Sequence, residues 1–257
     1  MRIVAHLSDL HFGRTDAAVV DGLIADLARH KPDLAIISGD LTQRARASQF
    51  TEARAFLARL PCPAVIVPGN HDLAPIYRPL SRLLAPRARF RRHLAGHDVW
   101  PIWTDEEIVA IGLDSTRPFR WTSGKLRTRH LDHIQRVVTA SNGAACRIAF
   151  LHHPHTHAFG HSFEALVRRD IDLILTGHVH HAHVGLITGP DNATSILIQA
   201  TTACSTRLRA DANGYGLIHI DMPHIDVALQ GWSGEAFHPI GRFRFEKRPD
   251  GWAELTI

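Results

Sequence analysis

The chain has 257 residues, 45% of them hydrophobic, and its 29 basic and 25 acidic side chains give a formal net charge of +4. This length allows a substantial core without disulfides and is compatible with one large α/β unit. No segment approaches the roughly 18 consecutive apolar residues of a membrane span, so the composition excludes a membrane-spanning class.

The first half of the chain is expected to alternate strands and helices. Residues 2–7 form an apolar run, and residues 16–30 carry a helical stripe that begins at an N-cap, either Thr15 or Asp16. The same alternation predicts strands at 34–37, 64–67, 99–103 and 108–113, helices at 48–60 and 128–140, and strands at 147–151 and 173–175. After Gly177 the pattern changes to strands separated by turns, at 184–187, 195–199, 216–220, 225–229 and 242–245. Two stacked sheets covered by helices follow from this order.

Five of these strands end at a polar motif. The motifs are Asp9-x-His11, Gly39-Asp40, Gly69-Asn70-His71-Asp72, His152-His153-Pro154 and Gly177-His178-x-His180. Because loops at the carboxyl ends of strands in an α/β sheet converge on one crevice, side chains more than 160 residues apart can meet there. The motifs offer seven oxygen and nitrogen ligands for two adjacent metal ions: Asp9, His11, Asp40, Asn70, His152, His178 and His180.

The ligand types restrict the choice of metal. Carboxylate, imidazole and amide donors without a thiolate favour manganese, iron(II), zinc or cobalt. Asp40 is the natural bridging ligand, since a carboxylate between two cations offsets their repulsion. With 20 His in the chain, an isolated His-x-His carries no weight; His178 and His180 are selected because they follow a strand. The other histidines nearby are expected to be rim or solvated side chains: His153, His155, His157, His161, His181 and His183.

The wording "HLSDLHFG", "ISGDLT", "VPGNHD", "FLHHP" and "LTGHVHHAH", across residues 5–183, resembles all five motifs of the calcineurin-like metallophosphoesterases. It is most similar to the bacterial cyclic-nucleotide and glycerophosphodiester phosphodiesterases, because "GLDSTRP" followed by "GKL" also matches them. The resemblance implies a four-layer α/β/β/α sandwich with two stacked mixed sheets. It also implies that Asp9, His11, Asp40 and His180 hold one ion, and that Asp40, Asn70, His152 and His178 hold the other.

The same resemblance places His71 over the phosphate, where it stabilises charge or protonates the leaving oxygen; the alternative is an imidazole that only orients Asn70. Two ions about 3.5–4 Å apart would lower the pKa of a bridging water and supply hydroxide. Asp72 is expected either to hold the His71 tautomer or to cap a helix. Arg14 and Arg117 either contact substrate or are surface charges.

We expect a single domain over 1–257, with a motif-bearing core at 1–188 and C-terminal strands at 189–257 that complete the second sheet. The first strand runs directly into a metal motif, which argues against a signal peptide. Few, odd and widely spaced cysteines (Cys62, Cys146 and Cys204) indicate reduced thiols, so we expect a cytoplasmic protein. The basic cluster at 87–93 is expected to be a solvated helix or loop rather than a nucleic-acid site.

The expected function is hydrolysis of small soluble phosphodiesters, such as cyclic nucleotides or glycerophosphodiesters. The motifs carry no extra cationic cluster that would bind a dianionic monoester, which favours diesters over the alternatives, phosphomonoester or nucleotide pyrophosphate hydrolysis. A non-catalytic scaffold is disfavoured because all seven ligands and His71 are retained. The expected partner is a small phosphoester, without nucleic acid or membrane, and a homo-oligomer is compatible with the sequence. Substrate choice is expected to reside in loops 73–96, 119–126, 155–162 and 202–214.

Overall fold

The structure is a computed structural model that describes residues 1–94, 98–141, 146–154, 161–209 and 211–256. Its first half alternates strands and helices in the order β1 (Arg2–Leu7), α1 (Ala17–His30), β2 (Leu34–Ile37), α2 (Ala47–Leu57) and β3 (Ala64–Ile66). The Asp16 side chain accepts a hydrogen bond from the Ala18 backbone N–H and caps α1, because a short carboxylate can satisfy a free amide of the first turn.

The first sheet has seven strands in the order β13-β12-β11-β10-β1-β2-β3. β1, β2 and β3 run parallel, and β10 pairs antiparallel with β1. The remaining strands of this sheet are consecutive antiparallel neighbours: β10 (Gly214–Asp221), β11 (His224–Trp232), β12 (Phe237–Arg248) and β13 (Gly251–Leu255). Because β1, β2 and β3 are parallel, their carboxyl ends lie side by side at the same end of the sheet.

The second sheet has six strands in the order β4-β5-β6-β7-β9-β8. Its centre is parallel, with antiparallel strands at both edges. The strands are β4 (Ile102–Thr104), β5 (Ile108–Leu113), β6 (Cys146–Leu151), β7 (Leu173–Thr176), β8 (His183–Thr188) and β9 (Thr194–Gln199). Both sheets are thus mixed, as the sequence analysis expected.

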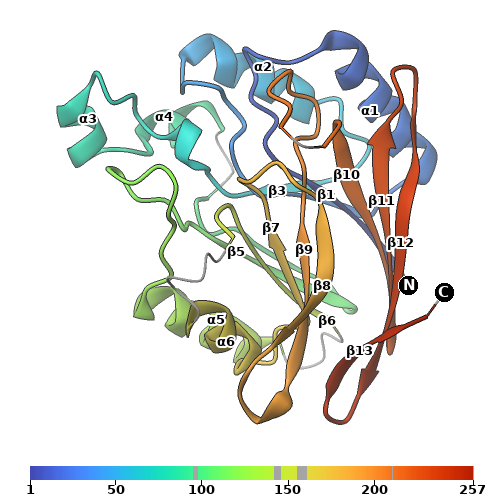
Figure 1. Cartoon of the computed structure of the whole chain (residues 1–257). Helices are drawn as coiled ribbons and strands as arrows, with labels where there is room; N and C mark the ends of the chain where they lie inside the picture. Colours follow the sequence, from blue (N-terminus) through green and yellow to red (C-terminus); the bar gives the residue numbers. More distant parts are fainter. Residues whose placement is uncertain (95–97, 142–145, 155–160, 210, 257) are drawn as a thin grey trace.

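Three buried clusters separate four layers (Figure 1). One lies between the first sheet and α1 and α2, and includes Leu23 and Phe50. The second joins the facing sides of the two sheets, for example Ile36 with Phe150. The third packs the second sheet against α5 (Thr128–Ala140) and α6 (His161–Val167). Because alternate residues of a strand face opposite sides, β5 sends Ile108 and Ala110 to the central cluster and Val109 and Ile111 to the third.

The expected strands and long helices are present, and the main differences concern short elements. The strand predicted at 99–103 is instead β4, at Ile102–Thr104, and loop 73–96 contains the short helices α3 (Pro79–Leu84) and α4 (Ala88–His93). Six-residue helices give too few turns for a periodic apolar stripe to be recognised. β13 was also missed, although Trp252 from this strand packs into the central cluster.

The strands after residue 188 do not all complete the second sheet, as was expected; they divide between the two sheets. β9 belongs to the six-stranded sheet, whereas β10 to β13 extend the sheet that begins with β1. Strand propensity alone does not select a partner strand, so this division could not be deduced from the pattern. Within the described parts of the chain, no helix combines the length and apolar character needed to cross a membrane.

Candidate metal centre

The motif loops meet where the carboxyl ends of the parallel strands from both sheets come together. Within the first sheet, the Asp9 backbone N–H donates to the Gly39 carbonyl at 3.1 Å and His11 N–H to the Asp40 carbonyl at 2.9 Å. Within the second, Gly177 N–H donates to the His152 carbonyl at 3.0 Å. The His178 N–H then donates to Asp9 Oδ2 at 2.8 Å, and this bond joins the two sheets at the site.

One group of donor atoms surrounds Asp9. Its Oδ1 lies 3.0 Å from His180 Nε2 and 3.5 Å from His11 Nε2, and the two imidazole nitrogens are 3.2 Å apart. Asp40 Oδ2 lies 3.8 Å from His11 Nε2. All four side chains are almost completely buried. Their nitrogen and oxygen atoms thus point into one small space.

A second group of donor atoms lies on the other side of Asp40. Asp40 Oδ2 is 3.3 Å from His152 Nε2, which in turn is 3.1 Å from Asn70 Oδ1 and 3.3 Å from His178 Nδ1. The His152 Nδ1 atom faces the Ser38 carbonyl at 2.8 Å. Since a carbonyl oxygen only accepts, Nδ1 carries the proton and Nε2 is directed at the cluster. Asp40 Oδ2 thus faces His11 in the first group and His152 in the second.

Five of the seven side chains sit on backbone in the left-handed region: Asp9, His11, Asp40, His178 and His180, with φ between 50° and 75°. Residues other than glycine rarely adopt this conformation, and it tends to persist at functional sites where surrounding contacts enforce it. The strain turns each side chain from the strand direction into the shared space. It therefore supports a function for the cluster beyond packing.

The glycines of the motifs allow the loops to approach. A Cβ atom at Gly177 would lie 1.8 Å from Ser8 Oγ and 2.6 Å from Asp9 Oδ2, and one at Gly69 would lie 2.1 Å from Asp40 Oδ1. Any larger residue would displace the carboxylates. This steric limit explains why glycine precedes Asn70 and His178 in the motifs.

The carboxylates and imidazoles of the cluster shift one another's pKa values. Burial alone would raise the pKa of Asp40, but the imidazoles of His152, His71 and His11 outweigh it and hold that pKa below its usual range. Burial lowers the pKa of His152, yet Asp40 and Asp9 overcome this and raise it to about 9. At neutral pH His152 therefore holds a second proton, on Nε2, and a bound cation would replace it.

The donor set fits a pair of divalent ions. Atoms from Asp9, His11 and His180, and separately from Asp9, Asp40 and His152, lie within 4.8 Å of one another. Carboxylate and imidazole donors without sulfur suit intermediate divalent metals. Within the described chain, no lysine or arginine forms an ion pair with Asp9 or Asp40, so cations remain the natural counter-charge.

His153 differs from its expected place at the rim. It is buried, its Nδ1 lies 2.9 Å from Ser115 Oγ, and it belongs to a donor group with His152 and His178. Its Nε2 has no hydrogen-bond partner among the described residues. The Ser115 contact, from the "GLDSTRP" loop after β5, draws His153 inward, and this pairing is not visible in a sequence. His181 and His183 are exposed, whereas His155, His157 and the side chain of His161 lie outside the described residues.

His71 lies beside the cluster, with its ring centroid 4.9 Å from that of His11. Its Nδ1 donates to the Gln43 carbonyl at 2.7 Å, and Arg207 Nη1 donates to its Nε2 at 3.2 Å. The backbone N–H of His71 donates to Asp40 Oδ1 at 2.8 Å. The backbone carbonyl of Gln43, rather than Asp72, therefore fixes the tautomer.

Asp72 has a structural role that neither expectation described fully. Its carboxylate accepts hydrogen bonds from the backbone of Leu41, Thr42 and Gly69, and a further one from the Thr42 hydroxyl. Gly69 immediately precedes the short 3₁₀ turn Asn70–Asp72, so one of these bonds caps that turn. The others tie the loop carrying Asp40 to the loop carrying Asn70. Burial and the nearby Asp40 raise the pKa of Asp72 to about 6.

Two pockets open beside His71. The first, which we call the apolar pocket, has a volume of about 380 Å³ and is lined by His71, Leu73, Pro75, Ile76, Tyr77 and Trp121. The second, which we call the arginine pocket, measures about 550 Å³ and is lined by Arg14, Arg44, Arg46 and Arg207 together with Gln43 and Gln49. The pockets share Gln43, Arg44 and Arg207. Trp121 and Arg207 lie in loops that the sequence analysis marked for specificity, but neither residue was singled out.

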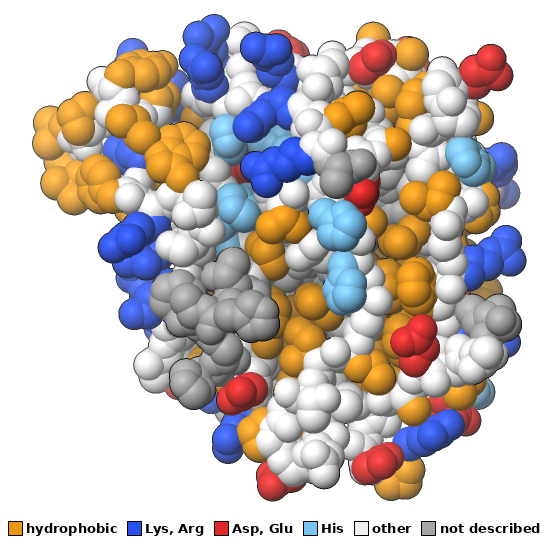
Figure 2. Space-filling model, viewed as in Figure 1, with side chains coloured by type: hydrophobic (Ala, Val, Ile, Leu, Met, Phe, Trp, Pro, Cys, Tyr) orange, Lys and Arg blue, Asp and Glu red, His pale blue; other side chains and the backbone are white. Residues whose placement is uncertain are grey.

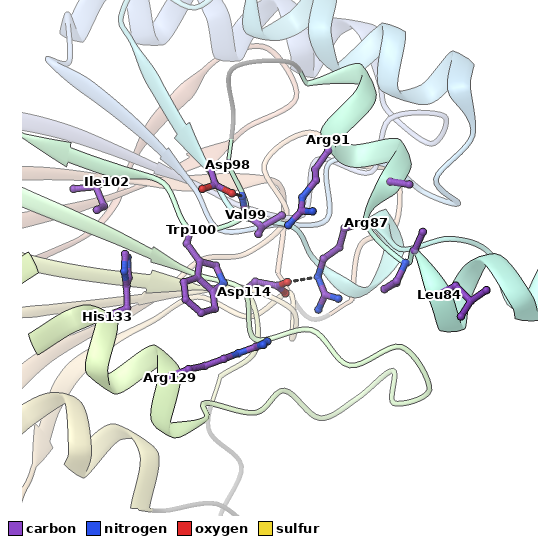
Figure 3. Close-up of a pocket in the computed structure, with 13 residues that line it drawn as sticks. Leu84, Arg87, Arg91, Asp98, Val99, Trp100, Ile102, Asp114, Arg129 and His133 are labelled. Atoms are coloured by element: carbon purple, nitrogen blue, oxygen red, sulfur yellow. Dashed lines mark hydrogen bonds and ion pairs between the residues drawn. The ribbon is translucent and has the colours of Figure 1, made fainter. Parts of the chain in front are cut away.

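The predictions for Arg14 and Arg117 have different outcomes. Arg14 does line a pocket at the site, whereas Arg117 lines neither pocket beside His71 and pairs through its backbone with Arg120, whose N–H donates to the Arg117 carbonyl at 3.2 Å. The basic cluster at 87–93 is α4 and its preceding residue. Arg87 pairs with Asp114 (Figure 3), and Arg89 donates to the Ala45 carbonyl at 2.7 Å. These contacts attach α4 to neighbouring loops.

A pocket of about 720 Å³ lies beside α4 (Figure 3). It is lined by Arg87, Arg91, Trp100, Asp114 and Arg129, with the Arg129 guanidinium 5.3 Å from the Trp100 ring centroid. None of the seven predicted ligands lines it. It therefore does not belong to the metal centre.

The chain matches known proteins over most of its length. A family model described as calcineurin-like phosphoesterase matches residues 3–182. The chain is 25% identical over 252 residues to a probable cyclic nucleotide phosphodiesterase of a Synechococcus species, covering 94% of this chain and 89% of that protein. It is 32% identical over 97 residues to a glycerophosphodiester phosphodiesterase of Enterobacter lignolyticus, covering 33% and 34% of the two chains.

Among solved structures, a purple acid phosphatase from yellow lupin superposes with a TM-score of 0.68 at 11% identity. The match covers 95% of this chain but 53% of the lupin chain, so the present chain spans about half of that protein. This likeness concerns the fold alone. It confirms the expected two-sheet α/β architecture.

Proposed function

This chain belongs to the calcineurin-like phosphoesterase family, and from that membership and the geometry of its buried cluster we propose that it is a dinuclear-metal phosphodiesterase acting on small soluble diesters. Cyclic nucleotides and glycerophosphodiesters are the substrate classes that the names of its relatives support. The observation that carries the proposal is the position of Asp40, whose Oδ2 lies 3.8 Å from His11 Nε2 in one group of donor atoms and 3.3 Å from His152 Nε2 in the other.

We assign one ion to Asp9, His11, Asp40 and His180, and the other to Asp40, Asn70, His152 and His178. Manganese, iron, zinc and cobalt all suit these donors. When bound, two such ions would supply the Lewis acidity that lowers the pKa of water toward neutrality and offsets the charge of a phosphate. The protein would shield both ions from most of the solvent, because six of the seven ligands are buried and His178 is half-buried.

The residues around the ligands would orient the phosphate. His71 is part-buried beside His11, so its Nε2 could reach an oxygen of a bound ester. Arg207 contacts the same Nε2 and could supply a positive charge there. The backbone carbonyl of Gln43 would keep the ring from rotating. These groups would bind and position the ester and move a proton at its leaving oxygen.

The preference for diesters rests on an apolar pocket rather than on the charge of the motifs. The motifs themselves carry no extra cationic cluster, but four arginines from the loops beside them gather in the arginine pocket. What supports a diester is the apolar pocket at His71, because a diester carries a second organic group that such a pocket could receive. Monoester or pyrophosphate hydrolysis remains the alternative for the same metal centre.

We expect kcat/KM for bis(4-nitrophenyl) phosphate to exceed that for 4-nitrophenyl phosphate by about tenfold or more, since burying one aromatic group contributes about 1.5–3 kcal/mol. Metal-stripped protein should be reconstituted separately with manganese, iron, zinc and cobalt, and both esters assayed under each loading. Trp121→Ala should reduce the diester-to-monoester ratio. A monoester that reacts faster under the same metal loading would exclude the diester assignment.

A further inference from the structure

The arginine pocket concentrates positive charge. Its charged lining residues are Arg14, Arg44, Arg46 and Arg207, and no carboxylate lines it. In the described part of the chain, no ion pair involves any of these four guanidinium groups, although other arginines, such as Arg59 and Arg244, do pair with acids. In Figure 2, Lys and Arg side chains gather in the upper middle of the face, next to a group of histidines.

The pocket is shaped by specific contacts rather than by chance crowding of surface side chains. Gln49 is buried, and its Oε1 accepts from the backbone N–H of Arg44 at 2.9 Å and of Arg46 at 3.3 Å. Its Nε2 lies so close to Gly13 that a Cβ there would be 2.2 Å away. The Arg44–Arg46 segment is therefore held against the loop that carries Arg14.

The pocket is also connected to the metal centre. The Arg14 carbonyl accepts from the Thr206 N–H at 2.7 Å, which brings the loop after His11 next to the loop with Arg207. The Arg207 carbonyl accepts from His180 Nδ1 at 3.0 Å, and its guanidinium contacts His71. Arg207 thus contacts the predicted metal ligand His180 and the predicted catalytic residue His71, and it also lines the arginine pocket.

A phosphate group matches this chemistry. Guanidinium groups bind phosphate oxygens through paired, charge-assisted hydrogen bonds, and four uncompensated positive charges in one concavity attract an anion. The N-terminus of α2, directly after Arg46, adds a partial positive charge, and its first turn contains no acidic side chain. The adjoining apolar pocket offers Trp121 and Tyr77 for a flat organic ring.

We propose that the arginine pocket binds a second phosphate group of the substrate, one that is not hydrolysed, while the apolar pocket receives its organic ring. The preferred substrate is then a nucleotide-like phosphodiester that bears an additional terminal phosphate. This inference rests on the proposed function, because it takes the ester to be cleaved at the metal centre beside His71. It assigns selectivity to Arg14, Arg44, Arg46 and Arg207.

The test compares two esters with the same leaving group: thymidine 5′-(4-nitrophenyl phosphate) with and without a 3′-phosphate. Wild-type protein should hydrolyse the 3′-phosphorylated ester with a kcat/KM about 10- to 100-fold higher, the effect of one or two charge-assisted contacts. In the double variant Arg14→Gln/Arg46→Gln this ratio should fall close to one. These two arginines line the arginine pocket but not the apolar pocket.

A matched control removes the same charge elsewhere. Arg54→Gln/Arg92→Gln changes two exposed arginines on α2 and α4 that line neither pocket. This control should keep the wild-type ratio. Equal kcat/KM for the two esters in the wild type, or a preference that survives Arg14→Gln/Arg46→Gln, overturns the proposal.

Binding gives a readout that does not depend on hydrolysis. Calorimetric titration of metal-stripped protein with thymidine 3′,5′-bisphosphate should show about 10- to 100-fold weaker binding for Arg14→Gln/Arg46→Gln than for wild type and for the control. If neither ester is hydrolysed with any metal but this difference holds, the proposed function fails while the phosphate subsite stands. If inorganic phosphate binds as tightly as the bisphosphate and shows the same arginine dependence, the pocket holds free phosphate and the substrate assignment is overturned.

Discussion

Asp40→Ala is expected to remove both bound metal ions and to abolish phosphodiester hydrolysis. Asp40 Oδ2 lies 3.8 Å from His11 Nε2 and 3.3 Å from His152 Nε2, so it is the carboxylate that faces both donor groups. Without it, two cations would face each other with no negative charge between them, and their repulsion in a buried site is large. Elemental analysis of purified protein and a diester assay measure the two effects.

Asp9→Ala should behave differently, because Asp9 contacts His11 and His180 closely and is assigned to one ion. We expect this variant to lose chiefly one metal equivalent. Asp26→Ala provides a control for the loss of a buried aspartate, because Asp26 lies on α1, accepts from the Tyr215 hydroxyl and belongs to none of the metal motifs. This variant should retain its metal content. Full metal occupancy in Asp40→Ala would contradict the bridging assignment.

His71→Ala is expected to keep nearly normal metal content while the rate of diester hydrolysis falls by about 10²–10⁴, the usual effect of losing a general acid or base. The Gln43 carbonyl holds the proton on Nδ1, so Nε2 of the neutral ring has only a lone pair. Proton donation from Nε2 therefore requires the doubly protonated ring. Burial lowers the pKa of His71, against the opposing effect of Asp40. The doubly protonated ring becomes scarcer as the pH rises through this pKa, so the contribution of His71 to the rate should decline toward alkaline pH.

The leaving group distinguishes the possible roles of His71. A good leaving group such as 4-nitrophenolate hardly needs a proton, so the loss in His71→Ala should shrink for it and reach its full size for a poor alkoxide leaving group. Equal losses for both would indicate electrostatic stabilisation instead of proton donation. Depleted metal would reduce His71 to a support for Asn70. His183→Ala, an exposed histidine, serves as the control and should leave rate and metal content unchanged.

The parts of the site that follow strands could be predicted because strand ends in a parallel sheet converge regardless of sequence separation. Asp9, Asp40 and His152 follow β1, β2 and β6 by a few residues at most, and the structure brings them together. The left-handed backbone of Asp40 had no sequence signal beyond Gly39, and that of Asp9 had none, yet both side chains lie in the cluster.

The parts of the site that the sequence did not reveal depend on packing between loops. The arginine pocket joins Arg14, Arg44 and Arg207 from three separate loops, and no local pattern marks loops that touch only in the folded chain. The burial of His153 depends on Ser115, 38 residues earlier in the chain. Asp72 illustrates the same limit, because its partners Leu41 and Thr42 lie on a different loop.

The most direct test of the dinuclear site is anomalous diffraction from crystals of wild-type protein grown with manganese. We expect two anomalous peaks about 3.5–4 Å apart, with Asp40 between them, one beside His11 and His180 and the other beside Asn70, His152 and His178. A single peak, or two peaks that do not share Asp40, would contradict the account.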